Sequence, residues 1–358
     1  MTDMTFVVEK QFLVSLANRI FKHGRGRIAF RSPLVQPQLL AVDPDFRAAS
    51  VVQREAFRDA RRAIVGHDDV ADREMPTWSD FTQAIQACGA VPPRNFPEFL
   101  ESLGRIEGDS GRAKSPAIAI DSNVAYNRLF SRHLDHVFDT SGAFRVLVSR
   151  GVRGEIDSRI RDKVSREELS RLYSSQPLAP YLDQLGNRNG LGTRKAKLAQ
   201  NEVDYLTARH SPIEAPCGAF EGDKEAFDRE ISKGYATSAE QQRLDAYMVT
   251  FDQNMINHAK NAGLRSLGLV LPEAERIKGA SLERSLPALV HDLAVIFGVI
   301  VVEPFDICVW GEWSGKTSDD YASERLRIEM DSDSPIMKAF ARDVDLGQRL
   351  LEESARWA

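Results

Sequence analysis

Ala117-Ile118-Ala119-Ile120-Asp121-Ser122-Asn123 is the stretch that decides the fold. Its four apolar residues predict a short buried strand, which ends at a carboxylate where a helix begins. The same order of strand, aspartate and helix recurs in Ala246-Tyr247-Met248-Val249-Thr250-Phe251-Asp252-Gln253-Asn254. In an open parallel sheet, ligands bind beyond the carboxyl ends of the strands. We therefore expect Asp121 and Asp252 to face one crevice.

Carboxylates gathered in one crevice predict a bound cation. They repel one another, which raises their pKa values unless a positive charge neutralises them. Glu155, near the start of the helix after the second strand, and Asp228, on the helix before the last Asp-bearing strand, extend the set. Such hard oxygen ligands suit one or two Mg²⁺ or Mn²⁺ ions. Asn123 and Thr250 are predicted to fix the acids by hydrogen bonds.

Each acid taken alone also has a purely structural interpretation. Asp121 is followed by Ser122 and fits an ordinary helix N-cap. Glu155 near a helix start would complement the helix dipole. Asp228 would equally suit the charged face of an exposed helix. The joint pattern of four acids favours the metal site.

The 358 residues are predicted to form three parts. Residues 1–112 are expected to be a helical accessory region, since Phe12 to Phe21, Val51 to Val65 and Trp78 to Ala87 show helical spacing. Residues 116–272 alternate strand and helix, which predicts a parallel sheet, interrupted by a long insertion at about 167–222. Residues 273–358 are expected to be a mixed α/β extension.

The motifs of the middle part resemble those of PIN-domain nucleases. The resemblance rests on Ile120-Asp121-Ser122-Asn123, Gly151-Val152-Arg153-Gly154-Glu155-Ile156, Asp228-Arg229-Glu230-Ile231 and Val249-Thr250-Phe251-Asp252, and it covers about 150 residues. It implies a PIN-like parallel sheet sandwiched by helices, and cleavage of RNA by water activated with Mg²⁺ or Mn²⁺. It further implies that Asp121, Glu155, Asp228 and Asp252 are the metal ligands, supported by Asn123 and Thr250.

Two features of the insertion leave alternatives open. The interval from Glu155 to Asp228 is longer than in small toxin-type members of the family, so Asp223 or Glu225 is an alternative third acid. Residues 187–197 resemble a glycine-rich loop with four cations, which would either contact phosphates or be a solvated loop. The cations are Arg188, Arg194, Lys195 and Lys197.

Composition limits the partners and the compartment. A net charge of -5 gives no global basic field, so a nucleic acid would be bound through a local patch. The three cysteines form no CxxC, which disfavours structural zinc and disulfides and predicts a reducing cytoplasm. No apolar run reaches the roughly 20 residues of a membrane span, and Met1 to Lys10 lacks the pattern of a signal peptide.

The predicted function is that of a cytoplasmic PIN-like endoribonuclease acting on single-stranded or structured RNA. The accessory parts would select the substrate or form a homodimer. Three alternatives stay open: a catalytically silent scaffold that binds RNA or protein, a nuclease directed at DNA such as single-stranded DNA, and a metal-dependent phosphohydrolase acting on nucleotides.

Overall fold

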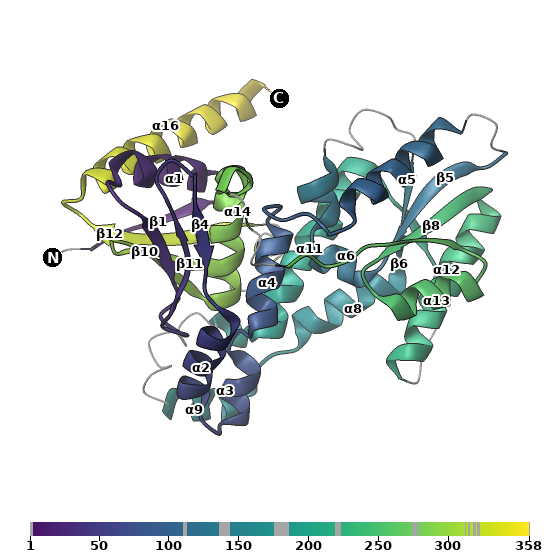
Figure 1. The fold of residues 1–358 in the computed structure, drawn as a ribbon, viewed down its shortest axis with the longest axis horizontal. Helices are drawn as coiled ribbons and strands as arrows, with labels where there is room; N and C mark the ends of the chain where they lie inside the picture. The colour runs from purple at the N-terminus through teal and green to yellow at the C-terminus, as the bar shows by residue number, and fades with distance from the viewer. Residues whose placement is uncertain are drawn as a thin grey trace. The chain divides into compact units, whose positions relative to one another are not determined.

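The computed structural model describes residues 3–109, 113–135, 144–174, 186–218, 223–273, 277, 279–311, 313, 316–317, 320 and 323–357. The chain divides into two compact units, each with its own sheet (Figure 1). Unit 1 comprises Met1–Val91, Lys163–Arg194 and Ala274–Ala358, and unit 2 comprises Pro92–Asp162 and Lys195–Glu273.

Unit 2 contains the predicted parallel sheet. Its five strands lie in the order β7-β6-β5-β8-β9, and every neighbouring pair is parallel. The strands are β5 (Ser115–Ile120), β6 (Arg145–Ser149), β7 (Ile213–Ala215), β8 (Leu244–Thr250) and β9 (Arg265–Gly268). The sequence predicts four of the five. It misses β7, a short edge strand inside the predicted insertion.

Helices cover both faces of this sheet. Ile118, Ile120 and Val249 on one face are buried with Phe99 of α5 and Leu206 of α11, while α12 and α13 pack against β8 on the other. The helical stretch from Val124 to Leu134 is interrupted, because Arg128 has a φ of 50°. The helices of unit 2 are α5 (Phe96–Gly108), α6 (Ser122–Tyr126), the π-helix η1 (Phe130–Leu134), α8 (Arg150–Arg161), α11 (Leu191–His210, in this unit from Lys195), α12 (Lys224–Gln241) and α13 (Gln253–Asn261).

Unit 1 is built on a seven-stranded antiparallel sheet in the order β1-β12-β11-β10-β2-β3-β4. The strands are β1 (Asp3–Glu9), β2 (Ile28–Arg31), β3 (Gln38–Val42), β4 (Ala49–Val51), β10 (Val299–Glu303), β11 (Ile307–Gly311) and β12 (Arg325–Asp331). Residues 1–112, predicted as a helical region, therefore also contain four strands. The first and last thirds of the chain, predicted as separate regions, share this one sheet because β1 pairs with β12 and β2 with β10.

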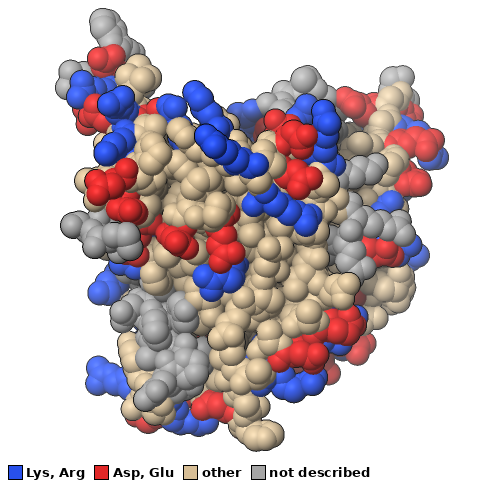
Figure 2. Space-filling model, turned by 60° about the vertical axis from the view of Figure 1, so that its left-hand side comes forward, with Lys and Arg blue, Asp and Glu red and all other residues tan. Residues whose placement is uncertain are grey.

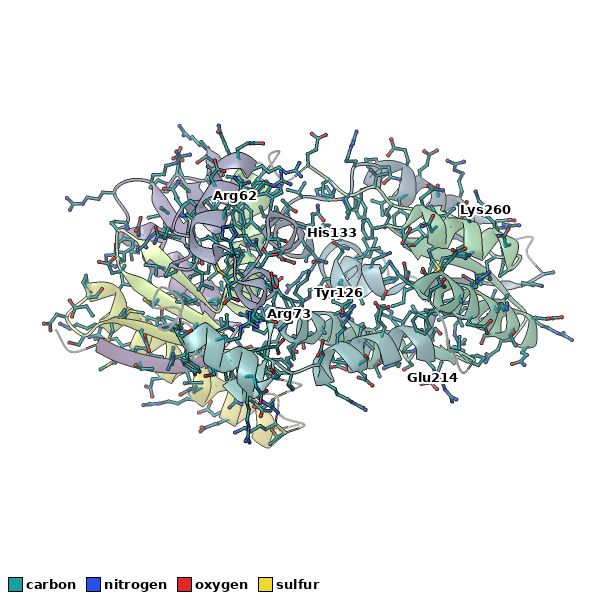
Figure 3. The ribbon with its side chains drawn as sticks, turned by 90° about the horizontal axis from the view of Figure 1, so that it is seen from below. Arg62, Arg73, Tyr126, His133, Glu214 and Lys260 are labelled. Atoms are coloured by element: carbon teal, nitrogen blue, oxygen red, sulfur yellow. The ribbon has the colours of Figure 1, made fainter. Side chains whose placement is uncertain are left out.

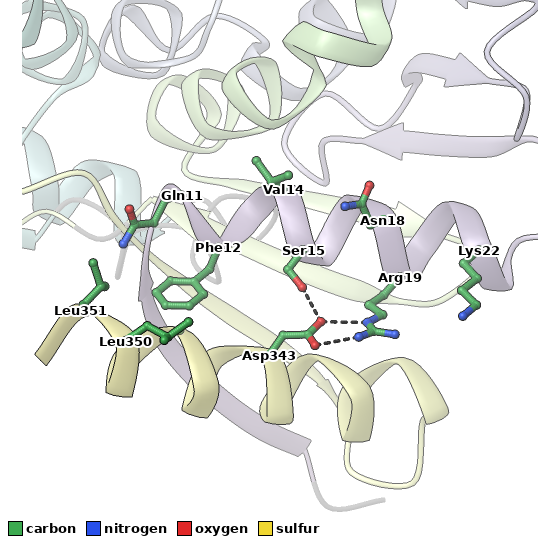
Figure 4. A pocket seen from close by; sticks show the side chains of 11 residues that line it. Gln11, Phe12, Val14, Ser15, Asn18, Arg19, Lys22, Asp343, Leu350 and Leu351 are labelled. Carbon is green, nitrogen blue, oxygen red and sulfur yellow. Dashed lines mark hydrogen bonds and ion pairs between the residues drawn. The ribbon is translucent and has the colours of Figure 1, made fainter. Parts of the chain in front are cut away.

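Helices of unit 1 pack against this sheet and against one another. α14 contacts β10, β11 and α1, and α1 in turn contacts α16. Between α1 and α16 lies a groove of about 620 Å³, where Asp343 accepts bonds from Ser15 and from Arg19 at 2.7 and 2.8 Å (Figure 4). Arg19 lowers the pKa of the Asp343 carboxyl. The helices are α1 (Phe12–His23), α2 (Arg54–Val65), α3 (Asp69–Glu74), α4 (Trp78–Ala87), α9 (Arg166–Ser174), η2 (Gly186–Arg188), α14 (Gly279–Phe297) and α16 (Pro335–Trp357).

Three further observations concern the cap of α4, the predicted insertion and the absence of a membrane-spanning helix among the described residues. Thr77 is the N-cap of α4 and forms a capping box with Asp80. Of the predicted insertion, residues 175–185 and 219–222 lie outside the described part of the chain. Within the described residues, no helix is both long enough and apolar enough to cross a membrane.

Candidate metal centre

The carboxyl ends of β5 and β8 meet where the strand order of unit 2 reverses. From β5 the chain proceeds to β6 and β7 on one side, then crosses to β8 and β9 on the other. Such a reversal opens a crevice at the carboxyl edge of the sheet, and ligands of open α/β folds bind there. Asp121 directly follows β5, and Asp252 lies two residues beyond β8. The two aspartates quoted from the sequence thus flank the same topological switch point.

Asp121 is held by several hydrogen bonds at this edge. Its Oδ1 accepts from the backbone N–H of Ser122 at 2.6 Å and from the Ser122 hydroxyl at 3.3 Å. Its Oδ2 accepts from the Thr250 hydroxyl at 2.8 Å and from the Asn123 amide. Asp121 is also the N-cap of α6, so the structural interpretation holds as well. The capping bond uses Oδ1, whereas side chains from β8 and α6 fix Oδ2.

Asn123 and Thr250 connect the two aspartate-bearing segments. The Thr250 hydroxyl accepts from Asn123 Nδ2 at 3.1 Å and from the backbone N–H of Asp252 at 2.9 Å. Asn123 Oδ1 accepts from the backbone N–H of Phe251 at 3.1 Å. The hydroxyl of Thr250 therefore uses its one proton and both lone pairs. The predicted hydrogen bonds of Asn123 and Thr250 to Asp121 are present, and they set its orientation.

Burial gives Asp121 an unusual proton affinity. The residue is only 5% exposed, and burial raises the pKa of its carboxyl to about 6. The bonds from Thr250 and Ser122 lower this pKa, whereas the charges of Asp228 and Glu155 raise it further. A carboxylate that accepts four bonds yet binds its proton more tightly than usual has no fully compensating positive charge among the described residues.

Glu155 and Asp228 extend the acidic set from two other elements. Glu155 lies on α8, and Asp228 lies on α12, where it is buried. Burial raises the pKa of Asp228, Lys224 lowers it, and the charges of Asp252 and Glu155 raise it. The charge of Glu155 thus acts on both Asp121 and Asp228, and that of Asp252 acts on Asp228.

Asp228 is a better third acid than the two alternatives. Asp223 is exposed and serves as the N-cap of α12, where it accepts from the backbone N–H of Ala226 at 3.0 Å. Glu225 is also exposed, in the first turn of the same helix. Asp228, by contrast, is buried, and its charge raises the pKa of the Asp121 carboxyl.

The donor set fits a hard divalent cation, although the side chains are not gathered as ligands. In the described part of the chain, no three His, Cys, Asp or Glu side chains are arranged as a metal-binding group. Lys224 Nζ lies 3.9 Å from Asp252 Oδ2 and supplies one nearby positive charge. Of the bonds to Asp121, that from the Ser122 hydroxyl is the longest, at 3.3 Å, so it is the bond that a cation would replace at the least cost. Coupled carboxylates of this kind are the ligands that Mg²⁺ and Mn²⁺ prefer.

Tyr235 supports the site and was not singled out by the sequence. It is fully buried on α12; its hydroxyl donates to the carbonyl of Ile120 at 2.5 Å and accepts from the N–H of Ser149 at 2.8 Å. It thereby joins the carboxyl ends of β5 and β6, next to Asp121. The available signal is its spacing, because Tyr235 lies seven residues after Asp228 and on the same face of the helix.

Replacing Tyr235 with Phe is expected to lower the free energy of unfolding by about 2 kcal/mol, because a buried N–H and a buried carbonyl each lose a partner. Urea denaturation would measure the change. Tyr173→Phe is the matched control, since Tyr173 is 48% exposed. Equal stabilities of the two variants would contradict the role assigned to the Tyr235 hydroxyl.

The predicted cationic loop is instead mostly helix. α11 begins at Leu191, so Arg194, Lys195 and Lys197 lie on a helix. Of the four predicted cations, only Arg188 is exposed. Arg194 is buried, donates to the carbonyl of Val295 at 3.2 Å, and has its pKa lowered to about 10 by burial. Lys197 is also buried. The buried Arg194 and Lys197 are not presented to a phosphate, which is a correction to the expected phosphate-binding loop.

Comparisons with protein-family models, with curated proteins and with solved structures give no match to this chain. Its function therefore has to be inferred from the geometry of the site itself.

Proposed function

We propose that this protein is a PIN-like endoribonuclease that cleaves single-stranded or structured RNA with Mg²⁺ or Mn²⁺. The observation that carries the proposal is the Asp121 carboxylate. It is buried at the switch point of a parallel sheet, oriented by Thr250 and Asn123, and coupled to Glu155 and Asp228. Burying an acid beside other acids costs stability, and such an arrangement is typical of sites whose function requires it.

In the proposed phosphodiester hydrolysis, the acids and their hydrogen-bond partners have different roles. Asp121, Glu155, Asp228 and Asp252 would hold one or two divalent ions, which when bound polarise the phosphodiester and lower the pKa of water. Thr250 and Asn123 keep Asp121 Oδ2 in a fixed direction and prevent it from rotating toward solvent. In the reaction, a water oxygen bonds to phosphorus, one phosphorus–oxygen bond breaks, and the leaving oxygen takes up a proton.

Charge distribution favours selection of the substrate by shape over tight nonspecific binding. Positive and negative side chains are interspersed on the face shown in Figure 2, in agreement with the net charge of -5. Nonspecific affinity for nucleic acid grows with the number of phosphates that a protein neutralises. We therefore propose that a small region near the acids makes the decisive contacts.

The test is cleavage of labelled single-stranded RNA and matched single-stranded DNA, each with Mn²⁺, Mg²⁺ or EDTA. We expect cleavage of RNA that requires the metal and stops in EDTA. Cleavage of DNA alone would assign the site to the DNA-directed alternative. Turnover of nucleotides or small phosphoesters, with both polymers left intact, would assign it to a phosphohydrolase.

A catalytically silent scaffold is the second candidate, and one observation favours it. Among the described residues, the acids are coupled but not arranged as a metal-binding group. For a scaffold, folded protein would cut neither polymer and would bind no Mn²⁺ in calorimetry. Retained binding of RNA under those conditions would make it an RNA-binding module.

A further inference from the structure

A cavity of about 690 Å³ lies in unit 2 directly beside the acidic set. Its walls come from α8, from the first turns of α12, and from Cys217 and Gly218. Glu155 and Asp228, two of the four acids, line it, so one end of the cavity belongs to the candidate metal centre. The volume lies within the range of about 300–1,000 Å³ that is usual for ligand sites.

The rest of the lining has the chemistry of a phosphate-binding surface. Arg159 and Lys224 line the cavity, and both are exposed. Arg150 also lines it and forms an ion pair at 2.5 Å with Glu214, which is labelled in Figure 3. α8 and α12 both begin at the cavity, and the N-termini of helices favour negative charge. An acidic end for a cation thus adjoins a basic part suited to an anion.

Phe227 supplies an aromatic surface in the same cavity. It lies on α12 next to Asp228 and is half-buried. Nucleic-acid bases stack on aromatic side chains with a free energy of about 1–3 kcal/mol per base, whatever the base. A ring among cations and beside a metal site fits a nucleotide better than it fits an inorganic anion.

The two glycines of α8 that line the cavity differ in their surroundings. A Cβ atom at Gly151 would lie 2.7 Å from Ile231 Cγ1, so packing within the protein accounts for that glycine. At Gly154 no heavy atom of the described residues lies within 4 Å of the Cβ position. Glycine inside a helix costs about 0.5–1 kcal/mol relative to alanine. Gly154 lines the cavity, so α8 presents no side chain to the cavity at this position.

We propose that this cavity binds one unpaired nucleotide next to the scissile phosphate, with its base on Phe227 and its flanking phosphate near Arg159 and Lys224. A base within a duplex is already stacked on its neighbours, so the cavity selects single-stranded segments. The inference rests on the proposed nuclease function and narrows its substrate to single-stranded segments. Because stacking does not distinguish the bases, we expect little sequence preference at this position.

The first test fills the cavity. Gly154→Phe is expected to raise the KM for single-stranded RNA at least about tenfold, by analogy with the loss of one stacked base. Gly154→Ala should have a much smaller effect. Gly104→Phe on α5 is the matched control, because Gly104 is also a helix-interior glycine with open space around it among the described residues. It lies outside the cavity, and its KM should not change.

The second test identifies the base. Once the cut has been mapped, an abasic nucleotide is placed on either side of it, and Phe227→Leu is compared with wild type. We expect each change alone to raise KM about tenfold and the two together to add little, because both remove one stacking contact. Independent, multiplying effects would mean that Phe227 acts only through folding, and would overturn the assignment.

Further measurements separate failure of the subsite from failure of the proposed function. Gly154→Phe should still bind Mn²⁺ in calorimetry, since the substitution removes no carboxylate. Wild type that cuts RNA while Gly154→Phe shows an unchanged KM would overturn the subsite alone. If wild type cuts nothing, the variants are compared in RNA binding by fluorescence anisotropy. Weaker binding by Gly154→Phe would then support the subsite, and equal binding would overturn it.

Discussion

Asp121→Asn is expected to lower the rate of metal-dependent RNA cleavage by about a thousandfold or more while the protein stays folded. The substitution keeps the size of the side chain but removes the negative charge that a divalent ion requires. A thousandfold loss corresponds to about 4 kcal/mol of transition-state stabilisation, a typical cost of removing one electrostatic contact of a reaction centre. Initial rates with saturating Mn²⁺ measure the effect, and circular dichroism confirms folding.

The matched control is Asp157→Asn. Asp157 lies on α8 two residues after Glu155, a spacing that places the two side chains on different sides of the helix, and it is exposed. It is not among the charges that raise the pKa of Asp121. Its substitution changes the net charge of unit 2 by the same amount and should leave the rate nearly unchanged. Equal losses in both variants would show that the charge of the region matters, and not a ligand at position 121.

The site was predictable from the sequence where its signals are local. A strand that ends in Asp and a helix that starts at once are fixed by neighbouring residues, so Asp121 and Asp252 were found together with their supports Asn123 and Thr250. Parallel pairing then places both at one edge, because β5 and β8 are neighbours in register over six residues.

The sequence failed where a role depends on distant partners. β1 pairs with β12, more than 300 residues later, and neither strand carries a strong local signal of that pairing. Tyr235 is hydrogen-bonded to the ends of β5 and β6, and its sequence neighbours do not indicate those contacts. Arg194 shows the converse: glycines and cations nearby predict a phosphate-binding loop, whereas the buried carbonyl of Val295 explains the arginine.

Asp121→Asn is also expected to stabilise the metal-free protein by about 2 kcal/mol at about pH 8. Burial and acidic neighbours raise the pKa of Asp121 from 3.8 to about 6, and about two units correspond to about 3 kcal/mol lost on folding with the charge present. Asparagine carries no charge and avoids that cost. The NH₂ group of the asparagine would face the donors of Thr250 and Asn123. This mismatch lowers the gain in the free energy of unfolding by about 1 kcal/mol.

The dependence of stability on pH distinguishes an effect of the buried Asp121 charge from a general effect of packing. Because the folded-state pKa is raised, native protein binds the proton more tightly than unfolded protein does. The stability of wild type therefore falls as pH rises between about 4 and about 6, and the penalty is complete above about 6. The two proteins should be nearly equal in stability at about pH 4.5 and differ by about 2 kcal/mol at about pH 8. Urea denaturation in EDTA measures both, and a pH-independent difference would contradict the prediction.

Adding the metal should reverse the order of stability. An ion that binds only the folded state at a hundred times its dissociation constant stabilises it by about 2.7 kcal/mol. Wild type gains this stabilisation because its carboxylate is charged and oriented, whereas Asp121→Asn lacks the ligand and gains little. The repulsion that destabilises the empty site is therefore the same property that lets it hold a cation. Equal stabilisation of both proteins by Mn²⁺ would place the ion elsewhere and separate the buried charge from metal binding.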